Sequence, residues 1–180
     1  MDASIIVSIN IVRCGARFLG RRSAPLVITA LTVCLVATPL VALSDDDIND
    51  LQTKIKSVEV RERREAARTL SQIGDNAAPA LSALIKALDD KDAQVIAHAL
   101  AAITQLGPNA QAAVPRLIDN LKNKNAQVRF RSAYALGQVG PEAVGPLIEA
   151  LNSESPHQRA GAATALAWIG TDALAAIDGL

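Results

Sequence analysis

The amino-acid sequence predicts an all-α fold, a right-handed α-solenoid of about four helix pairs. Half of its 180 residues are hydrophobic but only 2% are aromatic, so the core must consist of Ala, Leu, Ile and Val, a composition typical of packed helices. A long internal period supports this fold. Glycines recur at spacings of 33, 33 and 30 residues, and leucines repeat the 33 and 30 spacings independently: Gly74, Gly107, Gly140 and Gly170, then Leu88, Leu121 and Leu151.

Each period contains two apolar patterns at helical spacing, separated by a polar break. The first has leucines four residues apart beside an isoleucine, and it predicts an outer helix with one buried stripe. It occurs as LIKAL at 84–88, LIDNL at 117–121 and LIEAL at 147–151. The second is longer and rich in alanine, and it predicts an inner helix. It occurs as AQVIAHALAAITQLG from Ala93, AQVRFRSAYALGQVG from Ala126 and HQRAGAATALAWIG from His157.

The alanines of the second pattern explain why such helix pairs should stack. Two helices alone cannot bury this stripe, but small side chains let successive inner helices approach closely along a stack. The predicted repeats span about residues 46–77, 78–110, 111–142 and 143–172, within a repeat domain of residues 45–180. Residues 173–180 are either a partial cap or a truncated fifth unit.

The recurrent glycines and prolines mark the ends of these helices. A glycine directly after the last apolar residue of an inner helix suits a left-handed helix cap, and we expect this conformation at Gly140. Pro79, Pro115 and Pro146 fall near the start of the next helix, where a missing N–H is tolerated. Gly137 lies inside its helix, so alanine there should favour the helix if the site has room.

Residues 1–44 predict a secretory signal peptide. Four arginines precede an uncharged apolar run at residues 24–44, which contains Pro39 and ends on the small residues Ala42 and Ser44. We expect cleavage after Ser44. The alternative is an uncleaved membrane anchor, because residues 24–44 are long enough to span a bilayer. Both cysteines of the chain lie in this segment, so no thiol chemistry is expected in residues 45–180.

The repeat motifs resemble the HEAT-repeat family, in particular the short repeats named after phycobilisome lyases. The resemblance is carried by Val128-Arg129, by Ala135-Leu136-Gly137, by Val139-Gly140 and by the LIEAL segment at 147–151. It covers roughly residues 46–180. Ile96 departs from the pattern, because the motif has Arg there. The resemblance implies a solenoid whose inner helices line a concave groove.

Neither catalytic, cofactor-binding nor metal-binding residues are predicted. His98 and His157 have no neighbouring Glu, Asp or Cys at the spacing of a metal site. The acidic runs at 45–47 and 89–92 lack the glycine and distal glutamate of a calcium loop, so they are interpreted as caps of helix starts. Residues 45–180 carry 14 basic and 17 acidic side chains, a net charge of −3, which argues against a nucleic-acid partner.

The predicted partner-binding residues are those that the repeat does not require for packing. Arg64 and Arg68 have no carboxylate four residues away on their helix, so they are free to meet an acidic partner. Tyr134 and Trp168, the single Tyr and Trp of the chain, lie at exposed positions of inner helices, and aromatic and Arg side chains are common interface anchors. The complete predicted ladder is Arg64, Arg68, Gln72, Gln105, Arg131, Tyr134, Gln138 and Trp168.

The sequence therefore predicts an exported, non-catalytic scaffold that binds an unidentified protein partner along its concave groove and works outside the cytoplasm, in a periplasm or equivalent lumen. Two alternatives stay open. The family resemblance implies an accessory subunit of a bilin lyase, although such lyases act on cytoplasmic antenna proteins. If residues 24–44 remain attached, the chain is instead a membrane-tethered assembly factor.

Overall fold

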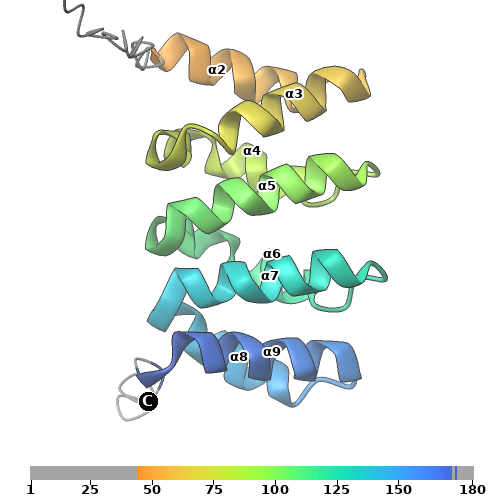
Figure 1. The fold of residues 1–180 in the computed structure, drawn as a ribbon, viewed down its shortest axis with the longest axis vertical. Helices are drawn as coiled ribbons and strands as arrows, with labels where there is room; N and C mark the ends of the chain where they lie inside the picture. The colour runs from red at the N-terminus through yellow and green to blue at the C-terminus, as the bar shows by residue number, and fades with distance from the viewer. Residues whose placement is uncertain (1–43, 172, 174–180) are drawn as a thin grey trace, which may run out of the picture. The chain divides into compact units, whose positions relative to one another are not determined.

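The computed structural model of the chain describes residues 44–171 and residue 173. This part of the chain contains helices and no strands, and its helices form four consecutive pairs (Figure 1). The outer helices are α2 (Asp45–Lys54), α4 (Leu81–Ala87), α6 (Val114–Asn120) and α8 (Val144–Leu151). The inner helices are α3 (Val60–Leu70), α5 (Ala93–Leu106), α7 (Ala126–Val139) and α9 (Pro156–Ile169).

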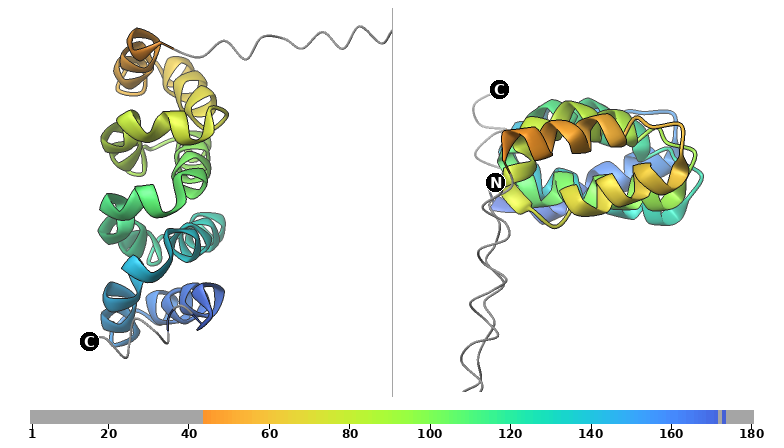
Figure 2. Two further views of the ribbon diagram at one scale, coloured as in Figure 1. Left: turned by 90° about the vertical axis from the view of Figure 1, so that its left-hand side faces the viewer. Right: turned by 90° about the horizontal axis from the view of Figure 1, so that it is seen from above.

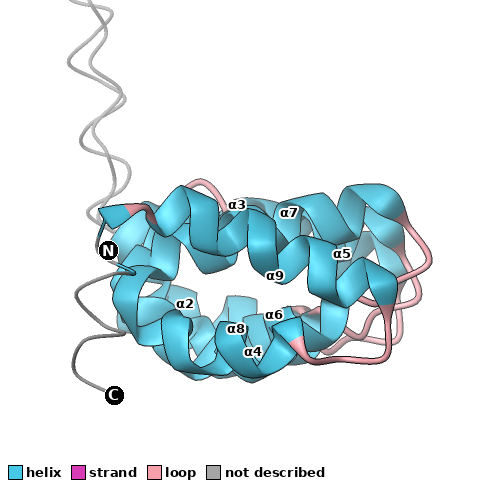
Figure 3. Cartoon of the chain, turned by 90° about the horizontal axis from the view of Figure 1, so that it is seen from below, coloured by secondary structure: helices cyan, strands magenta, loops and turns pink. Residues whose placement is uncertain are grey.

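The inner and outer helices form two rows (Figures 2 and 3). Each inner helix packs against the next one in the series α3, α5, α7 and α9, and each also packs against the outer helix of its own pair. Short 3₁₀ helices lead from one pair to the next: η2 (Gly74–Ala80), η3 (Gly107–Ala113) and η4 (Gly140–Ala143). The predicted all-α solenoid is confirmed.

The core follows the two sequence patterns. Alanines of the inner helices are buried at the contacts between repeats, and leucines of the outer helices fill the space between the two rows, including Leu84, Leu117 and Leu147, each 0% exposed. Alanines of the 3₁₀ helices, among them Ala77 and Ala110, are buried as well. A core of small and aliphatic side chains lets the helices approach closely, because little volume separates the backbones.

The last leucine of the outer pattern differs from its predicted equivalents. Leu88 and Leu121 are buried, but Leu151 is 36% exposed, so the expected buried stripe does not continue to this residue. The reason is that the leucine at this position of a repeat is buried by the inner helix of the following repeat. A methyl group placed at Gly161 of α9 would lie 2.8 Å from a side-chain methyl of Leu121, which shows how closely the next inner helix approaches. Leu151 belongs to the last helix pair that the structure describes.

The glycines that end the inner helices adopt positive φ, but their conformation is not the left-handed helical one expected. Gly140 has φ 83° and ψ −144°, and Gly107 has φ 51° and ψ −124°. This extended, mirror-image region is open essentially to glycine alone. It arises because the chain turns at once into the next 3₁₀ helix, while the amide of Gly140 still donates to the carbonyl of Leu136.

Gly137 has no room for a side chain, so the gain in helix stability that we expected from alanine at this position does not apply. A methyl group on Gly137 would lie 2.9 Å from the Cβ atom of Trp168, which belongs to the next inner helix. The missing side chain of Gly137 therefore lets Trp168 lie against α7. Residues 134–140 alone could not reveal this contact, because it joins two repeats that are about thirty residues apart in sequence.

No helix within the described residues is both long and apolar enough to cross a membrane. The predicted signal peptide or anchor, residues 1–44, lies outside the described residues apart from Ser44. Ser44 is the N-cap of α2, and it forms a capping box in which its hydroxyl accepts from the amide of Asp47 and the carboxylate of Asp47 accepts from the amide of Ser44. Of the predicted partial cap, only Ala173 is described.

Gly140 and Gly145 form a matched pair that separates backbone conformation from packing. A methyl group at either position would meet no atom within 4 Å, but only Gly140 has positive φ. We expect Gly140→Ala to lower the free energy of unfolding by about 1–2 kcal/mol. Gly145→Ala, in helix α8, should raise it by up to about 1 kcal/mol. Urea unfolding of both variants tests this, and equal shifts of the same sign would contradict the assigned backbone conformation.

Candidate functional site

The candidate site is the exposed surface of the inner helices α3, α5, α7 and α9, which we call the inner face. All eight residues predicted from the sequence are exposed, and all belong to inner helices except Gln72, which follows the end of α3. The described structure brings them together as a series across the stack: Arg64, Arg68 and Gln72 first, then Gln105 on α5, Arg131, Tyr134 and Gln138 on α7, and Trp168 on α9.

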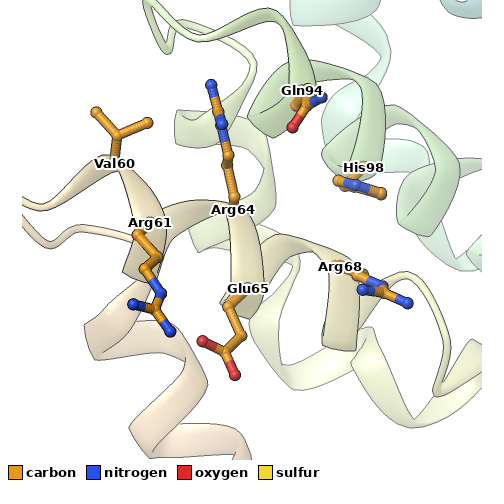
Figure 4. A pocket seen from close by; sticks show the side chains of 7 residues that line it. All are labelled: Val60, Arg61, Arg64, Glu65, Arg68, Gln94 and His98. Atoms are coloured by element: carbon orange, nitrogen blue, oxygen red, sulfur yellow. The ribbon is translucent and has the colours of Figure 1, made fainter.

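Three open grooves cross the inner face, one between each pair of successive inner helices. The groove between α3 and α5 is the largest, at about 690 Å³ (Figure 4), and its lining residues are Val60, Arg61, Arg64, Glu65, Arg68, Gln94 and His98. The groove between α5 and α7 has about 290 Å³ and includes Gln94, Ala97 and Arg131. The groove between α7 and α9 has about 280 Å³ and includes Phe130, His157 and Thr164. The first two grooves share Gln94, so they adjoin.

Arg64 is already paired with a carboxylate, although the sequence of its own helix predicted that it would be free to bind an acidic partner. Its guanidinium makes a two-pronged ion pair with Asp92, with distances of 2.9 Å from Nε to Oδ1 and 2.5 Å from Nη2 to Oδ2. Asp92 is the N-cap of α5, in the next repeat, and it also accepts hydrogen bonds from the amides of Gln94 and Val95. Helical spacing within α3 does not reveal this partner, because the carboxylate comes from the following repeat.

The hydrogen bonds from Arg64 hold the pKa of Asp92 at about 2, below its ordinary value of 3.8. Partial burial opposes this shift, and the amides of Val95 and Gln94 add to it. Asp92 is therefore charged throughout the neutral and mildly acidic range. Its carboxylate joins the start of α5 to the middle of α3.

Arg63 joins the same two repeats at the loop edge. Its Nε atom lies 2.6 Å from Oδ2 of Asp90, and its Nη1 donates to the carbonyls of Ser57 and Val58. Arg63 thus pairs with a carboxylate of the following repeat and not with Glu59, four residues before it in the sequence. Equivalent arginines at the start of α7 and α9, Arg129 and Arg159, bind the carbonyls of their own preceding loops.

Three arginines of the inner face form neither an ion pair nor a side-chain hydrogen bond with any described residue, unlike Arg129 and Arg159, which bind loop carbonyls. They are Arg61 and Arg68 on α3, and Arg131 on α7. All three are exposed and line grooves. Figure 4 shows the side chains of Arg61 and Arg68 pointing away from the Arg64 side chain. These three residues, rather than Arg64, can offer positive charge to another molecule.

An aromatic cluster occupies the other end of the inner face. Trp168 forms T-shaped contacts with the rings of Phe130 and Tyr134, with centroid distances of 5.6 and 5.4 Å and interplanar angles of 89° and 86°. Phe130 is 60% exposed, Tyr134 43% and Trp168 39%. Phe130 is not among the eight residues predicted from the sequence, although it belongs to this cluster. Its position four residues before Tyr134, on the same helix face, is the signal that could have found it.

The histidines lie in different grooves. His98 is half-buried between α3 and α5, and His157 is exposed between α7 and α9. Within residues 44–171 and 173, no three His, Cys, Asp or Glu side chains gather closely enough to hold a metal ion.

The ion pair of Arg64 with Asp92 should make the stability of the chain depend on pH in acid. Because the pKa of Asp92 is lowered in the folded chain, its contribution to stability is present above about pH 4 and is lost as pH falls through about 2. We expect Arg64→Gln to lower stability at neutral pH and to flatten the pH dependence between these values. Arg68→Gln is the control and should follow the parent profile. Thermal melting across this range measures both, and parallel profiles for the parent and Arg64→Gln would contradict the assignment.

Comparison with known proteins agrees with this architecture. The family model of HEAT repeats matches residues 81–146 and 114–180, and that of the PBS lyase HEAT-like repeat matches residues 62–90. No curated protein matches the sequence.

Several solved structures share the fold at low sequence identity. A designed armadillo repeat protein in complex with the peptide (KR)4 has a TM-score of 0.52 and 19% identity, over 75% of this chain and 74% of that chain. A second designed armadillo repeat protein has a TM-score of 0.51 and 23% identity, over 72% and 70% of the two chains. An engineered protein has a TM-score of 0.50 and 23% identity, over 74% and 67%. Because the two HEAT-repeat matches together cover more than half of its residues, the chain belongs to the HEAT-repeat family.

Proposed function

We propose that the chain is an exported, non-catalytic scaffold that binds a protein partner along the inner face. The fold supports the general part of this proposal, since a HEAT or armadillo-like repeat stack suggests a protein-binding scaffold. Such stacks offer extended surfaces for binding. The partner-binding residues proposed are the eight of the predicted ladder, with Arg64 acting through its hold on α5 and the others by direct contact.

The aromatic cluster is the observation that carries the proposal. Phe130, Tyr134 and Trp168 are three of the large hydrophobic side chains left exposed on the described residues, and they adjoin one another across two repeats. A grouped aromatic patch beside polar residues is the usual character of a protein interface, and aromatic side chains anchor such interfaces.

The composition of the grooves supports binding rather than catalysis. Neither His98 nor His157 is hydrogen-bonded to another described side chain, and the hydroxyl of Thr164 in the α7/α9 groove donates to the carbonyl of Ala160. A nucleophile held by a neighbouring base is the arrangement that acyl-transfer or hydrolytic chemistry requires. The described grooves present polar and aromatic contact groups instead.

One observation favours a second candidate, an accessory subunit of a bilin lyase. Residues 62–90 match the PBS lyase HEAT-like repeat, and these residues include most of the charged helix α3. Coloured product that depends on this chain, when it is co-expressed with a bilin and an acceptor protein, would favour this candidate over the scaffold.

The aromatic cluster can be tested directly. We expect the double variant Trp168→Ala, Tyr134→Ala, made in the full chain, to lose the partner that the parent retains in affinity purification from its native cells. Glu149→Ala, an exposed residue of the outer helix α8, is the control and should keep the partner. Thermal melting of both variants shows whether the stack remains folded. If the folded double variant captures the same partner as strongly as the parent, the aromatic cluster is not part of the binding surface.

The mature amino terminus tests export. We expect mass spectrometry of the chain from its native cells to find a start at Asp45. Cleavage there removes Ser44 and with it the capping box of α2, at a cost to helix stability of about 1 kcal/mol. The three aspartates of the first turn still favour the helix end electrostatically. A mature chain that retains residues 24–44 would instead favour the membrane-tethered assembly factor.

A further inference from the structure

Charge is unevenly divided between the inner face and the rest of the repeat domain. Residues 45–180 have a net charge of −3. The residues that line the three inner grooves nevertheless include five arginines and a single carboxylate, that of Glu65: the arginines are Arg61, Arg64, Arg68, Arg129 and Arg131. Of the other described carboxylates, that of Glu62 is on α3 but does not line these grooves. The rest lie on the outer helices, in the loops or 3₁₀ helices, or, like Asp92, are already paired with an arginine. A positive face on an acidic domain attracts acidic ligands to that face and away from the remaining surface.

The unpaired arginines are placed along one continuous path. Arg61 and Arg68 lie two helical turns apart on α3, about 10 Å along its axis. Arg131 lines the adjoining groove beyond α5, and Gln94 borders both grooves. Helix α5, which lies between them, contains no acidic side chain, and its half-buried Ala97 and Ala101 are small. A chain laid across α5 would therefore meet little obstruction and no negative side chain.

The dimensions suit an extended peptide. Neighbouring packed helices are about 8–10 Å apart, so the distance from α3 to α9 is roughly 25–30 Å. An extended chain rises about 3.3 Å per residue, so about eight or nine residues cover this distance. The aromatic cluster of Phe130, Tyr134 and Trp168 then lies at the far end of the path.

We infer that the inner face receives an extended acidic segment of the partner polypeptide, whose Asp or Glu carboxylates pair with Arg61 and Arg68 on α3 and with Arg131 on α7. This inference rests on the proposed scaffold function and specifies the chemistry of the partner. Arg64 does not pair with the segment. Its ion pair with Asp92 fixes α3 against α5, and so holds the groove in shape.

The probe is a fluorescein-labelled octapeptide of alternating Asp and Glu, titrated with the full chain at low ionic strength and followed by fluorescence anisotropy. We expect saturable binding that weakens as salt rises to about 0.15 M. An octapeptide of alternating Lys and Arg and an uncharged octapeptide of Ser and Gln should not bind. The double variant Arg61→Gln, Arg68→Gln should bind the acidic probe about tenfold more weakly.

A matched variant controls for net charge. Lys86→Gln, Lys122→Gln removes two positive charges from exposed residues that lie outside the grooves, so it should bind the acidic probe as the parent does. Equal weakening by both double variants would mean general attraction between charges and would overturn the inference. The exposed positions of Arg61 and Arg68 make unfolding of their variant unexpected, and thermal melting verifies this.

The same variants distinguish an acidic peptide from two other molecules that could bind the inner face, a nucleic acid and a second copy of the chain. Tighter binding of a short oligothymidylate than of the acidic peptide, lost in Arg61→Gln, Arg68→Gln, would assign the face to nucleic acid. A dimer in sedimentation velocity that the same variant dissociates would assign it to a second copy of the chain. Either result overturns the acidic peptide. If the acidic probe does not bind but partner capture still depends on Trp168 and Tyr134, this inference fails while the scaffold function stands.

Discussion

The structure depends on the close approach of successive inner helices over small side chains. Alanines occupy the buried positions between neighbouring inner helices, and glycines take the places where a side chain of an adjacent repeat comes closest. At Gly161 the neighbour is Leu121, and at Gly137 it is Trp168. Dispersion contacts fall steeply with distance, so this proximity gives many weak contacts per repeat. A larger side chain at either glycine would separate two repeats rather than disturb one helix.

The first two repeats are joined by charge as well as by packing. The guanidinium groups of Arg63 and Arg64 on α3 reach Asp90 and Asp92 at the start of α5. The Arg63 and Asp90 side chains are 16% and 9% exposed, so loss of one partner would leave the other poorly solvated and uncompensated. In the second repeat Ile96 stands where later repeats have an arginine that binds its own loop. The second repeat, which lacks this arginine, is thus the one whose loop aspartates, Asp90 and Asp92, pair with arginines of the first repeat.

Packing on one side of each inner helix leaves the other side free to carry function. Because alanines and leucines take the buried positions, the exposed positions are not constrained by the repeat, and they vary from charged on α3 to aromatic on α7 and α9. Trp168 serves both purposes, since its Cβ lies against Gly137 while 39% of the residue is exposed to solvent. Packing fixes its position in advance, and a preorganised anchor loses less conformational freedom when a partner binds.

The sequence by itself determined the all-α solenoid, the alternation of outer and inner helices and the exposed positions of the ladder. It could do so because these features follow from local periodicity, which repeats with every unit. Tertiary structure alone decided which side chains meet across repeats. The pairing of Arg64 with Asp92, the absence of space at Gly137 and the inclusion of Phe130 in the aromatic cluster all involve residues about thirty positions apart or the surface between two helices. Helical spacing within one repeat carries no information about such distances, because they depend on the offset and separation of neighbouring helices in the stack.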